Sequence, residues 1–299
     1  MPAGAEANLC DGAGEFQRPV CASRGRAGFA VPTRAGHRQW MQYLDVAQAR
    51  SRSGVRLALS KGVPGPWGES AKAILHVKGV EYAPVAQLPT LPNEDLLEWT
   101  GHANAPVLVV DQEPARAGWA DILFAAERLS PIPSLLPDSA TDRASMLGLS
   151  HEICGEDGFG WNRRHTMVHD GLSLMADTPA DVRAPLEVLA QRYGYSPQAG
   201  ERAPQRAADV LDALSGRLAQ AHAAGGHYFF GDRLSALDLY WACFAALVKP
   251  LPDKDCPMPN GLRALYEGAG DVVMKALTSE LLAHRDFIYQ EHLVLPVDF

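Results

Sequence analysis

Residues 55–79 read VRLALSKGVPGPWGESAKAILHVKG. In the first six positions apolar residues alternate with polar or small ones, and this period of two predicts a strand with one face in a core. Glycines and prolines follow at 62–66. Pro66 suits the first turn of a helix, because an N–H at that position has no partner within the helix. The apolar residues of 67–75 recur at steps of three and four, which predicts an amphipathic helix that ends at Gly79.

This order of strand, tight turn and helix has a chemical consequence at the turn. The N-terminus of a helix presents backbone N–H groups without intrahelical partners, together with the positive end of the helix dipole. Here these groups belong to the segment Pro66, Trp67 and Gly68. We therefore expect a ligand, preferably an anionic one, to bind above this turn.

Composition limits the kinds of partner. The chain has 299 residues, 47% of them hydrophobic, and a formal net charge of -8. This length is sufficient for two domains with a sizeable core. The negative charge argues against nucleic acid or an anionic membrane as a partner, and no apolar run is long enough to cross a bilayer. The odd number of cysteines, without a Cys-x-x-Cys pair, indicates free thiols in a reducing compartment: Cys10, Cys21, Cys154, Cys243 and Cys256.

The first forty residues differ from the rest. Ala, Gly, Arg and Pro dominate residues 1–40, and no helical or strand period holds there. We expect this segment to be a disordered extension, because it cannot bury enough apolar surface to offset the entropy of ordering. Patterned sequence begins at Met41, which is therefore an alternative true start of the protein; N-terminal sequencing of the native protein decides between Met1 and Met41.

After residue 79, strand and helix patterns alternate up to about residue 130, and only helical patterns follow. A second strand is expected at 80–86, at a sheet edge because it contains a proline. A third, buried strand is expected at 107–110, followed by a helix from Trp119. These elements predict an α/β domain over 53–130 and an all-helical domain over 140–295. The helices are expected at 142–154, 159–175, 180–193, 206–223, 236–247, 262–277 and 279–293.

Two further motifs resemble those of a known family. Ser235 and Asp238 have the spacing of a reciprocal capping box, with Leu234 as its hydrophobic staple, and Ala105 and Pro106 open the third strand. With the domain order, they resemble the cytosolic glutathione transferase superfamily. The resemblance identifies the chain as a divergent, bacterial-type member. It implies a thioredoxin-like N-terminal domain, an all-α C-terminal domain, and a cis peptide bond before Pro106.

The resemblance also implies a glutathione site, with three departures from the family pattern. Gly65 occupies the position at which several classes have a catalytic Cys or Ser, whereas residues 66–69 match the rest of that motif. Ser60, rather than a tyrosine, ends the first strand. Gly118 and Trp119 stand where the family usually has Glu-Ser or Gln-Ser.

From these matches we predict which residues bind glutathione and which activate it. The predicted glutathione-binding residues are Pro66, Trp67, Ala105, Pro106 and Trp119. A thiolate is favoured by positive potential or hydrogen-bond donors, so the helix dipole or the hydroxyl of Ser60 or Ser70 is expected to activate the thiol; Ser60 is the predicted catalytic residue.

The resemblance also implies that the second substrate, an electrophile, binds against the second helical segment of the C-terminal domain. Trp161 and Arg164 are the expected electrophile-pocket residues, and Arg163 is the alternative cation for an acidic group. His165 and His169 share a helix face, but no third ligand is evident, so no metal site is expected.

These observations predict a divergent glutathione transferase that transfers the glutathione thiolate to an apolar electrophile, with glutathione as co-substrate. The alternative is a non-catalytic scaffold of the same fold that binds a ligand or a protein. A disulfide reductase of the omega type is disfavoured because Gly65 replaces its cysteine. The resemblance further implies a homodimer with a small-molecule substrate. The free thiols favour the cytoplasm, and the composition argues against nucleic acid or membrane partners.

Overall fold

The computed structural model describes residues 41–299. The predicted disordered extension at 1–40, the choice between Met1 and Met41 as the start, and Cys10 and Cys21 lie outside the described residues. Within residues 41–299, none of the helices has the length and apolar character needed to cross a bilayer.

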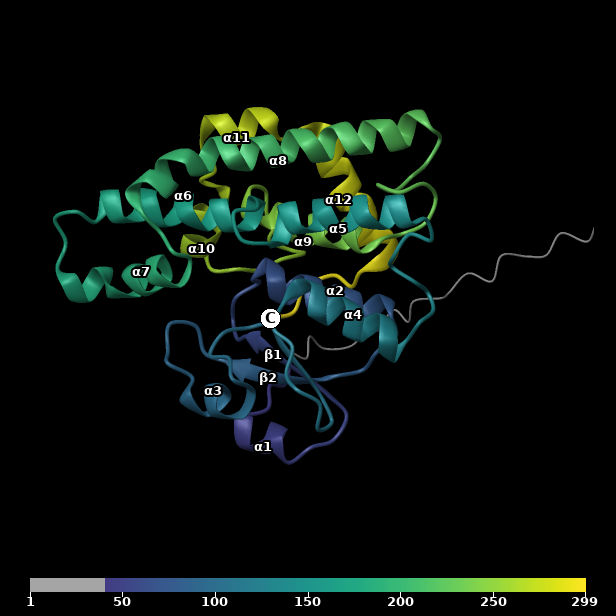
Figure 1. The fold of residues 1–299 in the computed structure, drawn as a ribbon. Helices are drawn as coiled ribbons and strands as arrows, with labels where there is room; N and C mark the ends of the chain where they lie inside the picture. Colours follow the sequence, from purple (N-terminus) through teal and green to yellow (C-terminus); the bar gives the residue numbers. More distant parts are fainter. Residues whose placement is uncertain (1–40) are drawn as a thin grey trace, which may run out of the picture. The chain divides into compact units, whose positions relative to one another are not determined.

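A three-stranded sheet forms the N-terminal part in the order β2-β1-β3 (Figure 1). β1 (Val55–Ser60) is central; β2 (Ala83–Gln87) runs parallel to it and β3 (Val107–Val110) antiparallel. The second strand begins three residues later than predicted. It pairs with β1 on one side, and on the other side Leu44 forms an isolated bridge with Val85. Pro84 is tolerated in β2 because an edge strand leaves backbone groups outside the ladder.

β1 is buried on both faces, which corrects the expectation of a single buried face. Ala58 packs in a second apolar cluster with Ala49 of α1 (Val46–Arg50) and Leu96 of α3 (Glu94–Thr100). Even Arg56 is only 2% exposed: its guanidinium donates to the carbonyl of Asp111 at 2.8 Å. The alternation of polar and apolar residues predicted an exposed face wrongly, because an arginine that donates to main-chain carbonyls can be buried.

The other face of the sheet is covered by α2 (Pro66–Val77) and α4 (Trp119–Leu129), which lie toward the helical region (Figure 1). α2 begins at Pro66 as predicted, and Gly79, with φ of 63°, follows its C-cap residue Lys78 in the left-handed conformation that glycine favours. The Lys78 ammonium is buried and bonds Glu127 of α4 at 2.8 Å, so the two helices are joined by charge as well as by apolar contact.

Eight α-helices make up the rest of the described chain: α5 (Ala140–Cys154), α6 (Phe159–Leu174), α7 (Ala180–Arg192), α8 (Pro197–Ala223), α9 (Ala236–Phe244), α10 (Asn260–Glu267), α11 (Gly270–Ala276) and α12 (Ser279–His292). A 3₁₀ turn, η1 (Ala245–Leu247), extends α9. Two predictions of helix bounds were wrong. α8 begins at Pro197, because proline is acceptable in its first turn. The single helix expected at 262–277 breaks at Gly268, and Gly270 has a φ of 73°.

α9 is the centre of the helical region, and its capping box is confirmed. All nine residues of α9 are buried. The Asp238 carboxylate accepts hydrogen bonds from the backbone N–H groups of Ser235 (2.8 Å) and Phe229 (3.0 Å), and lies 2.8 Å from His284 of α12. These bonds satisfy a fully buried carboxylate and connect three segments of the helical region.

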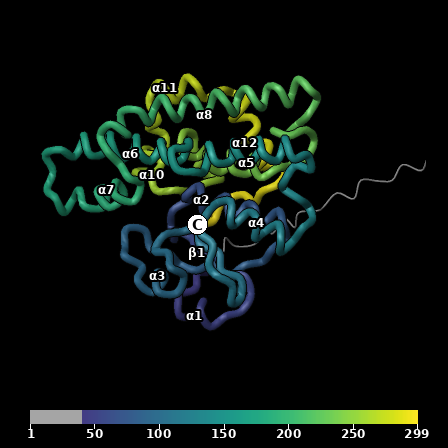
Figure 2. Tube along the Cα trace, viewed as in Figure 1, coloured from purple at the N-terminus to yellow at the C-terminus, as the bar shows by residue number. Residues whose placement is uncertain are grey.

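The C-terminal segment after α12 returns to the N-terminal part (Figure 2). Lys72 of α2 bonds the main-chain carbonyl of Asp298, and the Asp298 side chain accepts a hydrogen bond from the Met41 backbone at 2.9 Å. The two ends of the described chain are therefore tied together beside α2.

Candidate functional site

A cavity of about 320 Å³ lies where the first turn of α2, the turn before β3 and helices α6 and α7 meet; we call it the cleft. Its wall on the side of the sheet includes Ser60, Gly65, Trp67, Asn104, Ala105 and Pro106. Its wall on the helical side includes Trp161, Arg164, Leu189, Arg192 and Tyr193. The cleft thus brings together segments from both parts of the described chain.

The N-terminus of α2 opens into the cleft without a side-chain cap. The N-cap residue is Gly65, which has no side chain to accept a hydrogen bond from the first N–H groups. A Cβ at Gly68 would lie 3.3 Å from Leu59, so the glycine also allows the helix to pack closely on β1. The uncapped N–H groups and the helix dipole favour an anion at this edge of the cleft, and the carboxylate in the same turn, Glu69, is paired with Lys72.

The turn before β3 faces the same cavity. The peptide bond between Ala105 and Pro106 is cis, as the family resemblance predicted. Both residues line the cleft with Gly65 and Trp67, and Pro66 is the first residue of α2. Four of the five predicted glutathione-binding residues therefore lie at or beside one cavity: Pro66, Trp67, Ala105 and Pro106.

Trp67 both supports the fold and lines the cleft. Its indole N–H donates to the carbonyl of Cys154 at 2.8 Å, and its ring meets Phe244 edge-on at a centroid distance of 4.9 Å. Tyr193, from the segment after α7, lies 6.0 Å from the same ring. The ring therefore has a fixed orientation against the helical region while one side borders the cavity.

Trp119, the fifth predicted residue, is not among the residues that line the cleft. Its ring packs edge-on against Tyr240 at 5.5 Å and lies 6.3 Å from His151, and its carbonyl accepts a hydrogen bond from the Tyr240 hydroxyl at 3.0 Å. The first turn of α4 is thus directed at α5 and α9, and Ala117, two residues earlier, lines the cleft in its place.

Ser60 lines the cleft, but its proton has another acceptor. The Ser60 hydroxyl donates to the Gln87 side-chain oxygen at 2.8 Å. The Gln87 amide nitrogen donates to the carbonyl of Leu88 at 3.1 Å, which fixes the orientation of the amide. Ser60 would have to break its bond with a buried side chain to donate to a ligand. The Ser70 hydroxyl is likewise bound, to the carbonyl of Trp67.

The two adjacent arginines of α6 have different roles. Arg163 is fully buried and donates to the carbonyls of Leu247 at 3.0 Å and Gly268 at 3.1 Å, so it joins α6 to the segment around α10. Arg164 lines the cleft with Trp161, whose indole donates to the carbonyl of Tyr193 at 3.0 Å. Both predicted electrophile-pocket residues, Trp161 and Arg164, are therefore placed in the cleft.

The two histidines of α6 have separate partners. His165 contacts the carbonyl of Tyr193 at 2.7 Å, and His169 contacts the Tyr195 hydroxyl at 3.0 Å. Within the described part of the chain, no group of three or more His, Cys, Asp or Glu side chains is arranged to hold a metal ion.

Several cleft residues were not predicted from the sequence. Asn104 directly precedes the cis peptide and could have been inferred from that position. Arg192 and Tyr193 reach the cleft through the packing of α7, and Tyr43 from the segment before α1. Burial, with the nearby carboxylates of Glu69 and Asp298, raises the pKa of the Tyr43 hydroxyl. It is therefore a neutral donor, and no local sequence signal pointed to it.

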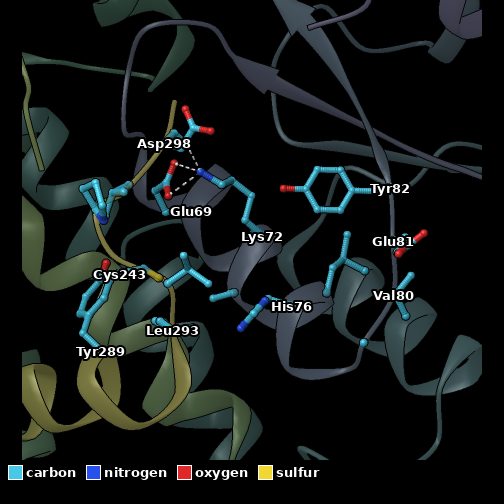
Figure 3. A pocket seen from close by; sticks show the side chains of 16 residues that line it. Glu69, Lys72, His76, Val80, Glu81, Tyr82, Cys243, Tyr289, Leu293 and Asp298 are labelled. Atoms are coloured by element: carbon cyan, nitrogen blue, oxygen red, sulfur yellow. Dashed lines mark hydrogen bonds and ion pairs between the residues drawn. The ribbon is translucent and has the colours of Figure 1, made fainter. Parts of the chain in front are cut away.

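A second cavity, of about 720 Å³, lies between α2 and the C-terminal segment; we call it the tail cavity (Figure 3). Its wall combines Ala73 and His76 of α2 with Cys243, Leu293 and Val297. Burial raises the pKa of the Cys243 thiol, which favours the protonated form over the thiolate. None of the residues predicted to form the site lines this larger cavity.

The wall of the tail cavity includes one ion pair and two further carboxylates, those of Glu81 and Asp298. Glu69 and Lys72 form an ion pair at 2.9 Å, and Lys72 also bonds the carbonyl of Asp298. The hydroxyl of Tyr82 points toward Lys72 (Figure 3). Burial raises the pKa of Glu69, and the Lys72 cation opposes this shift. Glu69 borders both cavities, so it belongs to the wall between them.

Comparison with protein families gives one match, within the helical region. The model of the glutathione S-transferase C-terminal domain family matches residues 197–267, which include α8, α9 and α10. No curated protein matches the chain.

Solved structures extend the similarity to most of the chain. A beta-etherase, LigF, from Sphingobium sp. strain SYK-6 is 18% identical with a TM-score of 0.56, and the match covers 79% of this chain and 94% of that one. A glutathione transferase family member from Pseudomonas fluorescens pf-5, solved with two glutathione molecules bound, is 16% identical with a TM-score of 0.52 and coverage of 82% and 93%. Glutathione transferase Omega 3C from Trametes versicolor is 15% identical with a TM-score of 0.51 and coverage of 82% and 84%. At these identities the matches establish a shared fold, a thioredoxin-like domain followed by an all-α domain.

Proposed function

We propose that this chain, a member of the glutathione S-transferase superfamily by its fold and its C-terminal domain, binds glutathione in the cleft and transfers the glutathione thiolate to an electrophile with an apolar body. One observation carries the proposal: the uncapped N-terminus of α2 and the cis Ala105–Pro106 peptide line the same cavity. The glutathione bound to the Pseudomonas fluorescens protein of the same fold supports it.

In this proposal the tripeptide lies along the sheet side of the cleft. The main chain of Ala105 pairs with the cysteinyl part of glutathione, which directs the sulfur toward Gly65 and Trp67. The dipole and N–H groups at the start of α2 then favour the thiolate over the thiol. This mode of activation needs no side chain at position 65. It also needs no hydroxyl from Ser60, which is hydrogen-bonded to Gln87.

The chemical step is a nucleophilic attack. The thiol proton is released to solvent, the thiolate sulfur attacks the electrophilic carbon, and a carbon–sulfur bond forms. The bond to the leaving group breaks, and its electron pair departs with that group. Trp161, Leu189 and Tyr193 form an apolar wall that orients the electrophile beside the sulfur.

Thermal unfolding with and without glutathione tests this proposal. At about 10 mM glutathione and a dissociation constant near 100 µM, binding adds roughly 2.7 kcal/mol of stability. The midpoint should rise by several degrees, at roughly 2–4 °C per kcal/mol for domains of this size. Dithiothreitol at the same thiol concentration is the control, because it has the thiol but no tripeptide. An equal midpoint with and without glutathione would overturn the proposal.

A binding-only function is the second candidate, and specific residues favour it. Gly65 has no side chain to activate a thiol, and Gly118 and Trp119 replace the pair that usually holds the γ-glutamyl end. Turnover of 1-chloro-2,4-dinitrobenzene separates the two functions. A glutathione-induced rise in midpoint, together with a rate equal to the uncatalysed one, would favour the binding-only function.

We also propose that the protein is a cytoplasmic homodimer, as the family resemblance implies. Light scattering coupled to size-exclusion chromatography measures the mass in solution against the 32.2 kDa of one chain. Cell fractionation tests the location. A mass of one chain, or recovery from another fraction, would contradict these two points.

A further inference from the structure

The cleft is positively charged although the chain is acidic. Its charged lining residues are Arg164, Arg192 and Glu69, and Glu69 is in an ion pair with Lys72 at 2.9 Å. Within residues 41–299, no carboxylate lies within ion-pair distance of Arg164 or Arg192, whereas the whole chain has a net charge of -8. Two guanidinium groups without counter-ions therefore border one cavity.

In the described part of the chain, Arg164 has only uncharged partners, the hydroxyls of Tyr266 and Tyr193 and the sulfur of Met167. One terminal nitrogen donates to the Tyr266 hydroxyl at 3.1 Å and the other to the Met167 sulfur, a weak acceptor, at 3.5 Å. Its Nε is buried without a partner, and the cation lies 5.2 Å from the centre of the Tyr266 ring. A buried donor that lacks an acceptor is unfavourable, so an anion beside this guanidinium would be stabilised.

Aromatic groups flank these cations. Trp161 meets Tyr193 edge-on at 4.8 Å, and Trp67 lies 6.0 Å from Tyr193. The hydrogen bond from the Trp161 indole to the Tyr193 carbonyl holds this arrangement. Rigid rings with the side chain of Leu189 offer a surface for a flat apolar group.

We propose that the electrophile is a flat aromatic or conjugated acid, whose ring lies against Trp161 and Tyr193 and whose carboxylate or sulfonate binds Arg164 and Arg192. This inference rests on the proposed function for the identity of the nucleophile. The inference adds an acidic group to the apolar electrophile of the proposed function. That group binds at the helical wall of the cleft.

A carboxylate at the two arginines has two possible sources, the electrophile and glutathione itself. The kinetic constants separate them. If the electrophile supplies the anion, loss of an arginine raises the KM of the acidic electrophile and leaves the KM of glutathione unchanged. If glutathione supplies it, the KM of glutathione rises with either kind of electrophile, and the inference is overturned.

The experiment uses a matched pair of electrophiles, 1-chloro-2,4-dinitrobenzene and 4-chloro-3,5-dinitrobenzoate, with the full chain and three variants. Arg164→Gln and Arg192→Gln each remove one cation. Arg183→Gln is the control, because Arg183 lies on α7 with Arg192 but does not line the cleft. We expect each cleft variant to raise the KM of the acid about tenfold or more, with little change for the neutral electrophile and none in Arg183→Gln. Equal effects on both electrophiles would overturn the inference.

A binding measurement without glutathione keeps this test separate from the proposed function. Calorimetry of the unreactive 3,5-dinitrobenzoate against 1,3-dinitrobenzene should show tighter binding of the acid, lost in Arg192→Gln and retained in Arg183→Gln. That result upholds the anion site even if glutathione fails to bind. Arg192 is exposed, so its variant remains informative if Arg164→Gln does not fold. Failure of the wild-type protein to prefer the acid would overturn the inference.

Discussion

The two cavities beside α2 share Glu69 but differ in the state of their charges. The tail cavity is the larger, at about 720 Å³ against about 320 Å³, and its Lys72 cation is bonded to Glu69 and to the Asp298 carbonyl. The cleft has an uncapped helix N-terminus and two arginines, Arg164 and Arg192, that form no ion pair within residues 41–299. Both walls have charges without an ion pair among residues 41–299, but these are arginines in the cleft and the Glu81 carboxylate in the tail cavity. The sign of the unpaired charge, rather than volume, therefore distinguishes the site at which an anionic ligand is expected.

The largest expected effect tests where the cleft ends. Trp67→Ala and Trp119→Ala should each lower the free energy of unfolding by about 3 kcal/mol, because both rings pack against other aromatic side chains. Only Trp67→Ala should abolish the rise in midpoint caused by glutathione. Urea unfolding gives the first quantity and thermal scans give the second. Loss of the rise in Trp119→Ala alone would place the ligand at α4 instead.

A smaller effect tests whether the tail cavity is held by its own charges. Lys72→Met should cost about 2 kcal/mol of stability, since it leaves a largely buried carboxylate without its cation. The double variant Glu69→Gln with Lys72→Met should recover part of this loss, because no unpaired charge remains. Urea unfolding of the four proteins completes a double-mutant cycle. Additive losses would show that the two side chains do not interact.

The pH dependence of stability tests the burial of Glu69 in the wall of the tail cavity. Burial raises the pKa of Glu69 above its usual value of 4.5, so the folded state binds this proton more tightly than the unfolded state does. The stability that this proton provides is complete below pH 4.5 and is lost as the pH rises through the raised pKa. The wild-type protein should therefore lose stability relative to Glu69→Gln on going from pH 4.5 to neutral pH. Parallel stability curves for the two proteins would contradict the shift.

The smallest expected effect concerns the hydroxyl of Ser60. Ser60→Ala should change the turnover rate by less than about tenfold, because the hydroxyl proton is bonded to Gln87. An oxyanion or thiolate donor would cost more, about 10²–10³ in rate. The same substitution should lower stability by about 1 kcal/mol, since Gln87 loses a donor. A fall in rate of a hundredfold or more, with an unchanged KM for glutathione, would show that Ser60 activates the thiol.

The sequence alone determined the elements whose causes are local. The strand over Val55–Ser60, the helix start at Pro66 and the stop at Gly79 follow from residues within a turn of one another, and all three agree with the structure. The capping box of Ser235 and Asp238 has the same local origin. The family resemblance, rather than the local pattern, supplied the cis bond before Pro106.

Only the tertiary structure decided which side chains share the cleft. Trp119 and Ala117 are two residues apart, yet only Ala117 lines the cavity, because the rotation of α4 depends on its contacts with α5 and α9. Arg164 and Arg192 come from different helices, and Tyr43 precedes the first strand. Their proximity results from packing between segments distant in the sequence, whereas periodicity and capping report only on neighbours along the chain.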